Sequence, residues 1–178
     1  MYDVLIIGAG VNGCASAYFL SQAGLRVALI DQEAIASGGS GAAGAFISPK
    51  ISKAGELKNI MNEAHAEALA FYTTYFPQFT LTKPLFHIAN SPKESEKLEY
   101  FKRDTALKHS RIDGELTSLL TTEALSDSHI YFDEGAVVDA QGVCHAMAEG
   151  SDFFVLKADK PIYSEELWHI GALSAKHL

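Results

Sequence analysis

The stretch VLIIGAGVNG, residues 4–13, decides the fold of this chain. Its first four residues are apolar and end at a glycine, which predicts a short strand buried on both faces. Its last six residues form a G-x-G-x-x-G motif that opens a helical pattern, and Gly24 lies where the C-cap of that helix is expected. A second apolar run, residues 27–30, ends in Asp31. This order of strand, glycine turn, helix, strand and acid predicts one βαβ unit.

The glycines and the acid each have a physical role in binding a dinucleotide. Gly8 allows the tight turn, Gly10 lets the backbone approach a pyrophosphate, and Gly13 lets the helix pack closely on the strand. The helix N-terminus offers unpaired N–H groups to the phosphates. Asp31 is placed to accept hydrogen bonds from an adenosine ribose, and its charge disfavours the 2′-phosphate of NADP. A structural βα turn without a ligand is the alternative, but the complete fingerprint favours dinucleotide binding.

The segment ASGGSGAAGAF, residues 36–46, separates FAD from NAD. Its small residues let backbone amides and the hydroxyls of Ser37 and Ser40 approach a ligand closely. A flexible connector is the alternative, but a connector would rarely run straight into the sequence FISP, residues 46–49. Here the sequence resembles the FAD-dependent amino acid oxidase family, which includes D-amino acid oxidases, glycine oxidases and sarcosine oxidases. In that family a Ser/Gly/Ala loop after the second strand lies along the pyrophosphate and the flavin.

The resemblance extends well from Asp3 to about Tyr72 and more loosely beyond, and it implies FAD as the cofactor. Residues 48–52 and 64–72 look most like one branch of the family, the oxidoreductase domain of the bifunctional tRNA 5-methylaminomethyl-2-thiouridine enzyme. The glycine motif and the resemblance together give these candidate cofactor-binding residues: Gly8, Gly10, Val11, Asn12, Gly13, Asp31, Gln32, Ser37, Ser40, Gly41, Ala42 and Gly44.

The expected fold class is α/β, with a Rossmann-like FAD-binding βαβ unit and the beginning of an α+β substrate domain, in an incomplete fold. By resemblance, residues 1–80 form the FAD-binding part with the ADP half, the flavin loop and a long helix. Residues 81–135 begin the substrate domain. Residues 136–178 return to the FAD-binding domain and stop before its last strand.

Three helices are expected after the glycine motif. Apolar residues recur at helical spacing from Leu57 to Tyr75, and we interpret this stripe as core, with His65 at the surface or its boundary. The sequence SPKE, residues 91–94, combines a capping box with proline at the first helical position. Asp139 is expected to cap a third helix that carries Cys144.

The two cysteines are expected to be structural. Cys14 lies in the first turn of the dinucleotide helix, where the dipole can lower its pKa, but packing against the sheet is the favoured role. Cys144 and His145 are neighbours on one helix and point in different directions, which argues against a catalytic pair.

The composition predicts a soluble, cytoplasmic protein with a buried core. Of the 178 residues, 48% are hydrophobic and the formal net charge is −8, which disfavours a nucleic-acid-binding surface on this stretch. Two cysteines are too few for a disulfide framework. No apolar run approaches the roughly 20 residues of a membrane span. The seven histidines lack metal-ligand spacing, so no metal site is expected.

The resemblance implies oxidation of a C–N bond by hydride transfer to the flavin, followed by hydrolysis of the imine. The substrate would be a small secondary amine or amino acid, or a carboxymethyl group on a modified tRNA wobble uridine. The family's arginine for the substrate carboxylate is expected beyond Leu178, because Arg26, Arg103 and Arg111 are unconvincing candidates. We therefore assign no catalytic residue and expect an N-terminal fragment, inactive alone, whose partner is the missing C-terminal half.

Two other functions stay open at this stage. The βαβ unit can hold a nucleotide as a non-catalytic binding module, or it can belong to an NAD-dependent dehydrogenase. The loop of residues 37–46 favours flavin over nicotinamide, because NAD-binding folds usually proceed directly from the second strand to another helix.

Overall fold

The computed structural model describes residues 1–42, 44–51, 56–103, 109–110, 129–157, 161–164, 167–170 and 172–176. The chain divides into two compact units, which are described separately: residues 1–45 with 139–178 form unit 1, and residues 46–138 form unit 2. The domain boundaries at residues 80 and 135 were drawn from the family resemblance and stay a prediction.

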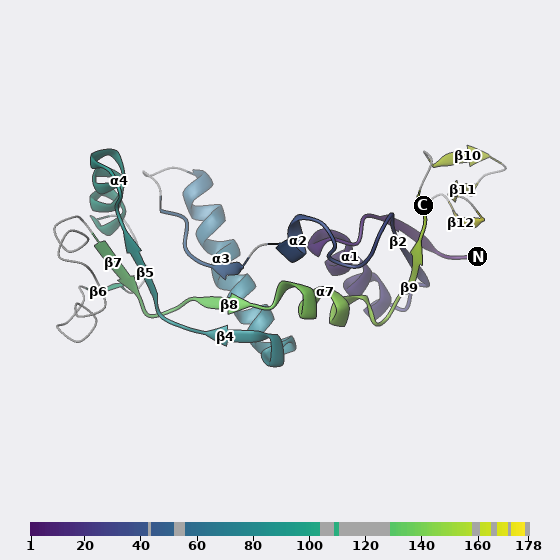
Figure 1. Cartoon of the computed structure of the whole chain (residues 1–178), viewed down its shortest axis with the longest axis horizontal. Helices are drawn as coiled ribbons and strands as arrows, with labels where there is room; N and C mark the ends of the chain where they lie inside the picture. Colours follow the sequence, from purple (N-terminus) through teal and green to yellow (C-terminus); the bar gives the residue numbers. More distant parts are fainter. Residues whose placement is uncertain are drawn as a thin grey trace. The chain divides into compact units, whose positions relative to one another are not determined.

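Unit 1 contains the predicted βαβ arrangement, with a third parallel strand beside it (Figure 1). The sheet has the order β1-β2-β9, and both neighbouring pairs are parallel. Helices α1 and α7 pack against each other. The bounds are β1 Val4–Ile7, α1 Val11–Gln22, β2 Val27–Asp31, α7 Ala140–Ala148 and β9 Asp152–Val155. Gly24 has a φ of +82° directly after α1, and the Asp139 carboxylate accepts a hydrogen bond from the Gly142 N–H, so both predicted helix signals are confirmed.

The prediction that the first strand is buried on both faces is wrong. β2 is fully buried over its first four residues, but Ile7 of β1 is 54% exposed. The alternation of a strand explains the difference, because Ile6 faces α1 near Gly13 while Ile7 points the other way. On the side of Ile7 an open apolar cavity of about 340 Å³ is lined by Leu5, Ile7, Pro161, Trp168 and Ile170.

A three-stranded antiparallel sheet completes the described part of unit 1. Its order is β10-β11-β12, with β10 Ile162–Ser164, β11 Leu167–Ile170 and β12 Leu173–Lys176. A parallel bridge between Tyr2 and Ala175 joins this sheet to the N-terminus.

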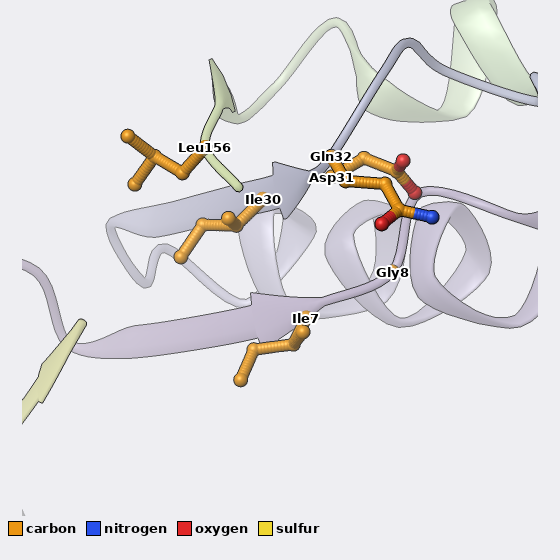
Figure 2. Close-up of a pocket in the computed structure, with 6 residues that line it drawn as sticks. All are labelled: Ile7, Gly8, Ile30, Asp31, Gln32 and Leu156. Atoms are coloured by element: carbon orange, nitrogen blue, oxygen red, sulfur yellow. The ribbon is translucent and has the colours of Figure 1, made fainter. Parts of the chain in front are cut away.

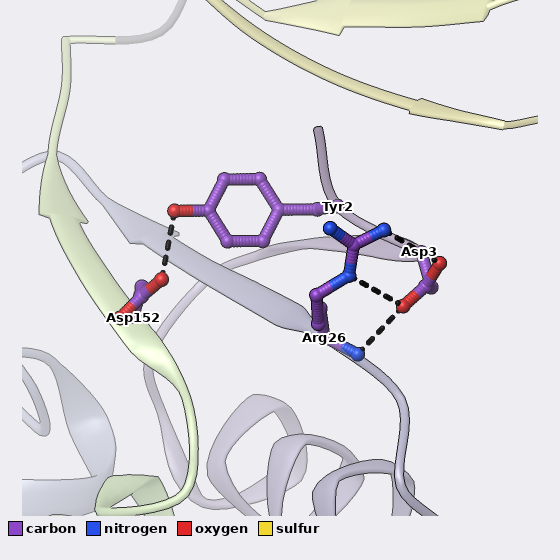
Figure 3. Close-up of polar contacts among 4 residues, drawn as sticks. All are labelled: Tyr2, Asp3, Arg26 and Asp152. Atoms are coloured by element: carbon purple, nitrogen blue, oxygen red, sulfur yellow. Dashed lines mark hydrogen bonds and ion pairs between the residues drawn. The ribbon is translucent and has the colours of Figure 1, made fainter.

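Side chains at the N-terminus fasten the start of the parallel sheet (Figure 3). The Asp3 carboxylate accepts hydrogen bonds from the Arg26 backbone N–H at 2.8 Å and from its Nε at 3.2 Å. The Tyr2 hydroxyl donates to Asp152 Oδ2 at 2.8 Å, and this hydrogen bond raises the pKa of Tyr2. Arg26 is thus engaged at the amino end of the sheet, away from the glycine turn at its carboxyl end. This agrees with its exclusion as a substrate-binding arginine.

The described residues of unit 2 form two small sheets and two α-helices. One sheet has the order β3-β8-β4 and the other has the order β5-β7-β6. The strands are β3 Ala45–Ile47, β4 Thr80–Thr82, β5 Leu85–Ile88, β6 His109–Ser110, β7 His129–Phe132 and β8 Ala136–Val138. The helices are α3 Glu56–Tyr75, the 3₁₀ turn η1 Pro77–Phe79, and α4 Pro92–Arg103.

The core of unit 2 lies where α4 meets β7. Its buried residues are Ala89, Leu98, Phe101, Ile130 and Phe132. One half of the predicted capping box of α4 is present, because the Glu94 N–H donates to Ser91 Oγ. The Glu94 carboxylate accepts from the N–H of Asn90, one residue before the N-cap. The cap fixes where α4 begins and so which of its residues reach the core.

The predicted core face of α3 is wrong in the first half of the helix. Leu57, Ile60 and Met61 are 69%, 54% and 42% exposed, whereas Lys58 and His65 are only 4% and 6% exposed. Helical spacing shows that apolar residues share a face, but it does not show which face the neighbouring elements cover. The Lys58 side chain is long enough to bury its stem while its Nζ lies 5.4 Å from the centroid of the Phe101 ring.

The burial of His65 makes it a pH-sensitive position. Neither ring nitrogen has a hydrogen-bond partner among the residues that the structure describes. Burial lowers the pKa of His65, against a smaller opposing effect of the Glu134 charge. A histidine with a lowered pKa in the folded state stabilises the fold above its unfolded-state pKa of about 6.5, and this contribution is lost as the pH falls.

We predict that the free energy of unfolding decreases as the pH is lowered from about 7.5 to about 5.5. His65→Leu should remove the part of this decrease that comes from protonation of His65. Denaturant unfolding of both proteins across this range measures it. His87→Leu, at an exposed position on β5, controls for the loss of an imidazole. An unchanged pH dependence in His65→Leu would contradict a buried neutral imidazole.

Candidate functional site

The glycine turn between β1 and α1 forms the base of the candidate site. Gly8 has a φ of +100°, and its N–H donates to the Ile30 carbonyl at 2.7 Å, which closes the turn against β2. A Cβ at Gly13 would overlap the Gly8 carbonyl oxygen, so the helix can start this close to the strand only with glycine there. Gly10 is the N-cap of α1 and has an extended backbone without a side-chain cap.

Asp31 fastens this turn at the end of β2. Its Oδ2 accepts a hydrogen bond from the Ala9 N–H at 2.8 Å, and its Oδ1 accepts one from the Glu33 N–H at 3.1 Å. A carboxylate has about four acceptor positions, so these two bonds leave capacity for a ligand hydroxyl. Asp31, which the sequence predicts to contact a ribose, therefore also holds the glycine turn, which is predicted to bind the phosphates.

The small-residue segment after Asp31 contains a short helix, α2 Gly39–Ala42, where the sequence suggested only a loop. Ser40 Oγ accepts a hydrogen bond from the Val11 N–H at 3.0 Å and thus supplies the cap that Gly10 lacks. A Cβ at Gly10 would lie 3.0 Å from Ser40 Oγ, so the glycine also makes room for this hydroxyl. The hydroxyl keeps its own proton to donate, and it lies at the N-terminus of α1, the end of a helix that attracts anions.

The start of this segment is anchored to the same turn. The Ala36 N–H donates to the Ala9 carbonyl at 2.8 Å, and Ala36 is buried with a φ of +56°. A Cβ at Gly41 would overlap the Ala36 carbonyl oxygen. These contacts bring α2 against the N-terminus of α1, although the rest of α1 and the whole of β2 lie between them in the sequence.

A cavity of about 260 Å³ opens at the carboxyl ends of the parallel strands (Figure 2). Open parallel α/β sheets bind their ligands at this edge. The Leu156 N–H donates to the Asp31 carbonyl at 2.8 Å, which brings the end of β9 to the same place. The lining residues are Ile7, Gly8, Ile30, Asp31, Gln32 and Leu156.

The structure brings five of the twelve sequence candidates to two neighbouring places. Gly8, Asp31 and Gln32 line the cavity, and the Val11 N–H and the Ser40 hydroxyl are hydrogen-bonded at the start of α1. The other seven candidates do not line the cavity. Ile7, Ile30 and Leu156 were missed, although the rule that carboxyl ends of adjacent parallel strands share one edge would have found them.

Gly44 of the sequence candidates lies next to Ala43, which is outside the described residues. Within the described part of the chain, no group of three or more His, Cys, Asp or Glu side chains is arranged to hold a metal ion. Among the helices of the described residues, none is long and apolar enough to cross a membrane.

Residues 3–151 match the protein family DAO, described as FAD dependent oxidoreductase. The chain belongs to this family. Its enzymes depend on FAD, so the prediction of FAD as the cofactor is confirmed. The residues present fit that cofactor, since Gly8 and Asp31 border the cavity and the Ser40 hydroxyl lies at the start of α1.

Known proteins show where in the DAO family the similarity lies. The tRNA 5-methylaminomethyl-2-thiouridine biosynthesis bifunctional protein MnmC of Leptospira interrogans is 36% identical over 98 residues, which are 54% of this chain and 15% of that protein. The glycine oxidase structure from Bacillus cereus matches with a TM-score of 0.77 and 20% identity, covering 99% of this chain and 53% of that one.

A third similar protein has the cofactor bound. The L-alpha-glycerophosphate oxidase of Mycoplasma pneumoniae, solved with FAD, matches with a TM-score of 0.74 and 19% identity over 95% of this chain and 49% of that one. The predicted α/β fold with a Rossmann-like FAD-binding region is thus confirmed. The chain spans about half the length of these solved structures.

We predict that Gly13→Ala destabilises the chain by about 1–3 kcal/mol, because its methyl group would overlap the Gly8 carbonyl oxygen and force helix and turn apart. Gly38→Ala is the matched control, since a Cβ there has no atom within 4 Å. Its effect should stay within about 0.5 kcal/mol. Equal unfolding midpoints for the two variants would contradict the close packing of α1 on the turn.

Proposed function

We propose that this chain binds the ADP part of FAD at the glycine turn, in a protein that oxidises a C–N bond of a secondary amine or an amino acid. The observation that carries the proposal is the cavity at the ends of β1, β2 and β9, where Asp31 holds the glycine turn. Cavities at this edge suit a nucleotide, because strand ends and a helix N-terminus converge there.

Each side of the proposed site has a separate task. The N–H groups in the first turn of α1 bind the pyrophosphate, and Gly10 allows its close approach. Ser40 accepts the Val11 N–H and donates its own proton to a phosphate oxygen. Asp31 accepts from the ribose hydroxyls. When bound, FAD supplies the hydride acceptor, and this half of the site only holds and orients it.

The proposed substrates have a carboxymethyl or similar group on nitrogen. Similarity to a glycine oxidase structure and to MnmC supports this class, because both names point to chemistry beside an amine nitrogen. Oxidation of the C–N bond gives an imine, and its hydrolysis releases glyoxylate from either glycine or a carboxymethylamino group. The stretch shared with MnmC favours a modified tRNA uridine.

We also propose that a further polypeptide segment, equivalent to the half of the solved relatives that this chain does not span, completes the protein. Two separate observations support it. In unit 2, Leu57, Ile60 and Met61 form an exposed apolar stripe on α3. In unit 1, Ile7 and Trp168 border an open apolar cavity. Apolar patches of this kind usually mark surfaces that another element covers.

The sequence left two other functions open, an NAD-dependent dehydrogenase and a non-catalytic nucleotide-binding module. An NAD-dependent dehydrogenase does not agree with the match to an FAD-dependent family. A non-catalytic nucleotide-binding module would bind FAD or ADP but would show no turnover of any amine. Assays of the full-length protein therefore separate it from the proposed oxidoreductase.

We predict that Asp31→Ala weakens FAD binding about tenfold or more, because hydrogen bonds to a charged group contribute about 1.5–3 kcal/mol. Fluorescence titration of the chain with FAD measures the dissociation constant. Asp31→Asn keeps an oxygen that can accept the Ala9 N–H. Its dissociation constant for FAD should fall between those of the unmodified chain and Asp31→Ala. Circular dichroism of the free variants separates a lost contact from a lost fold, and unchanged affinity in a folded Asp31→Ala would refute the ribose contact.

Ser40→Ala is predicted to weaken FAD binding about fivefold, since a lost helix cap costs about 1 kcal/mol. Its control is Ser16→Ala on the same helix, where the exposed hydroxyl only donates back to the Asn12 carbonyl. The same titration measures both. If Ser16→Ala has the larger effect, Ser40 does not hold the start of α1 for the phosphates.

For the whole reaction, the protein encoded by the full-length gene should release glyoxylate from tRNA that carries carboxymethylaminomethyl-uridine. Glycine and sarcosine serve as competing small substrates in the same assay. Turnover of the free amino acids without turnover of the tRNA would remove the tRNA substrate and keep the oxidase. Absence of turnover with all three would favour the binding module.

A further inference from the structure

Unit 2 contains an open cavity of about 340 Å³ that the proposed contacts to FAD do not use. All the residues that line it belong to unit 2. The lining is mostly apolar and includes three phenylalanines, one serine and one histidine. Sites for small molecules typically have volumes of about 300–1,000 Å³ and combine apolar walls with a few polar groups. The cavity therefore has the composition of a binding site and the size for one ring system.

The floor of the cavity is held by the core of unit 2. The Phe132 side chain is 3% exposed, and its ring packs edge-to-face on Phe101 with the ring centroids 5.7 Å apart. Leu85 and Ile51, which also line the cavity, pack against the same core. A Cβ at Gly135 would overlap the Leu85 side chain, so the turn after β7 packs closely on this residue. These contacts give the floor a defined shape in the absence of a ligand.

The rim of the cavity exposes aromatic surface to solvent. Phe46 of β3 is 67% exposed and lines the cavity. Phe86 of β5 also lines it, and the centroid of its ring lies 5.7 Å from that of the His129 ring. An exposed ring at the border of an apolar cavity offers a face on which another flat ring can stack.

Two polar side chains lie beside this aromatic surface. Ser48 follows Phe46 by two residues and His87 follows Leu85 by two, so each polar residue shares a side of the extended chain with an apolar one. Both polar residues are exposed, and hydroxyl and imidazole groups can each donate and accept hydrogen bonds. Among the described residues that line the cavity, none is Asp, Glu, Lys or Arg. The cavity therefore suits an uncharged flat ring with hydrogen-bonding groups on its edge.

We propose that this cavity binds one unpaired uracil base, which stacks on Phe46 and forms hydrogen bonds with Ser48 and His87. The choice of an RNA base rests on the proposed function. Proteins that recognise unpaired RNA bases stack them on aromatic side chains and bind their polar edges. Uracil fits the groups present, because it is flat and uncharged and carries carbonyl acceptors and an N–H donor. The formal net charge of −8 agrees with binding of the base rather than of the phosphates.

Amide NMR spectra of the isotope-labelled chain, recorded while uridine is added, test the site. The largest shifts are expected for Phe46, Ser48, Phe86 and His87, and they should saturate. Dihydrouridine is the matched ligand, because it keeps the sugar and the polar groups while its ring is no longer flat and aromatic. It should bind about tenfold more weakly, since stacking on the exposed ring is lost. Equal binding of the two nucleosides, or no saturable shift at these residues, would overturn the proposal.

Variants locate the stacking surface. Phe46→Ala should weaken uridine binding about tenfold without removing a buried side chain. Tyr75→Ala is the matched control, since Tyr75 is 58% exposed on α3 and does not line the cavity. Ser48→Ala should weaken binding about fivefold through one lost hydrogen bond. Equal uridine affinity of Phe46→Ala and Tyr75→Ala would overturn the proposal, and the comparison with dihydrouridine tests stacking without any variant.

Addition of FAD keeps this inference apart from the proposed function. FAD should leave the uridine shifts in place, because it is proposed to bind at the glycine turn of unit 1. Release of uridine by FAD would assign the cavity to the cofactor and overturn the inference. Uridine binding to a chain that does not bind FAD would support the inference and overturn the proposed function. FAD binding without uridine shifts would overturn the inference alone.

Discussion

The hydrogen bond from the Ala9 N–H to the Asp31 carboxylate is the interaction on which the rest of the candidate site depends. It joins the glycine turn after β1 to the end of β2 at 2.8 Å. With the turn held there, the Ala9 carbonyl accepts hydrogen bonds from the Ala36 N–H and the Cys14 thiol. The bond from Ala36 helps to bring α2 against the start of α1. A charged acceptor is suited to this task, because hydrogen bonds to ionised groups are stronger than those between neutral groups.

The same carboxylate therefore has a structural role and a proposed binding role. Since a carboxylate accepts more than two hydrogen bonds, the structural role does not prevent the binding role. The arrangement also explains why small residues gather after β2. Gly10 and Gly41 each stand where a Cβ would meet Ser40 or the Ala36 carbonyl. Close approach of α2 to the turn is thus a packing requirement of this unit as well as a means of reaching a phosphate.

The parts of the fold that could be predicted from the sequence are those fixed by neighbouring residues. The unit from Val4 to Asp31 was predicted because glycine positions, apolar runs and the terminal acid are all local signals. The cap at Asp139 and the capping box at Ser91 were predicted for the same reason. The family match confirms the flavin that the resemblance implied.

The parts that were missed depend on neighbours distant in the chain. The buried face of α3 was wrong because the Phe101 ring accommodates Lys58, and no property of α3 alone shows this. Ser40 was expected near the ligand, but its bond to Val11 follows from the unexpected helix α2.

The central claim is that FAD binds at the glycine turn beside Asp31. Amide NMR spectra of the isotope-labelled chain, recorded while unlabelled FAD is added, test it most directly. The largest shifts are expected for Gly8, Gly10, Val11, Gln32 and Ser40, with little change in unit 2. Shifts centred instead on the unit 2 cavity, lined by residues such as Ser48 and His87, would contradict it.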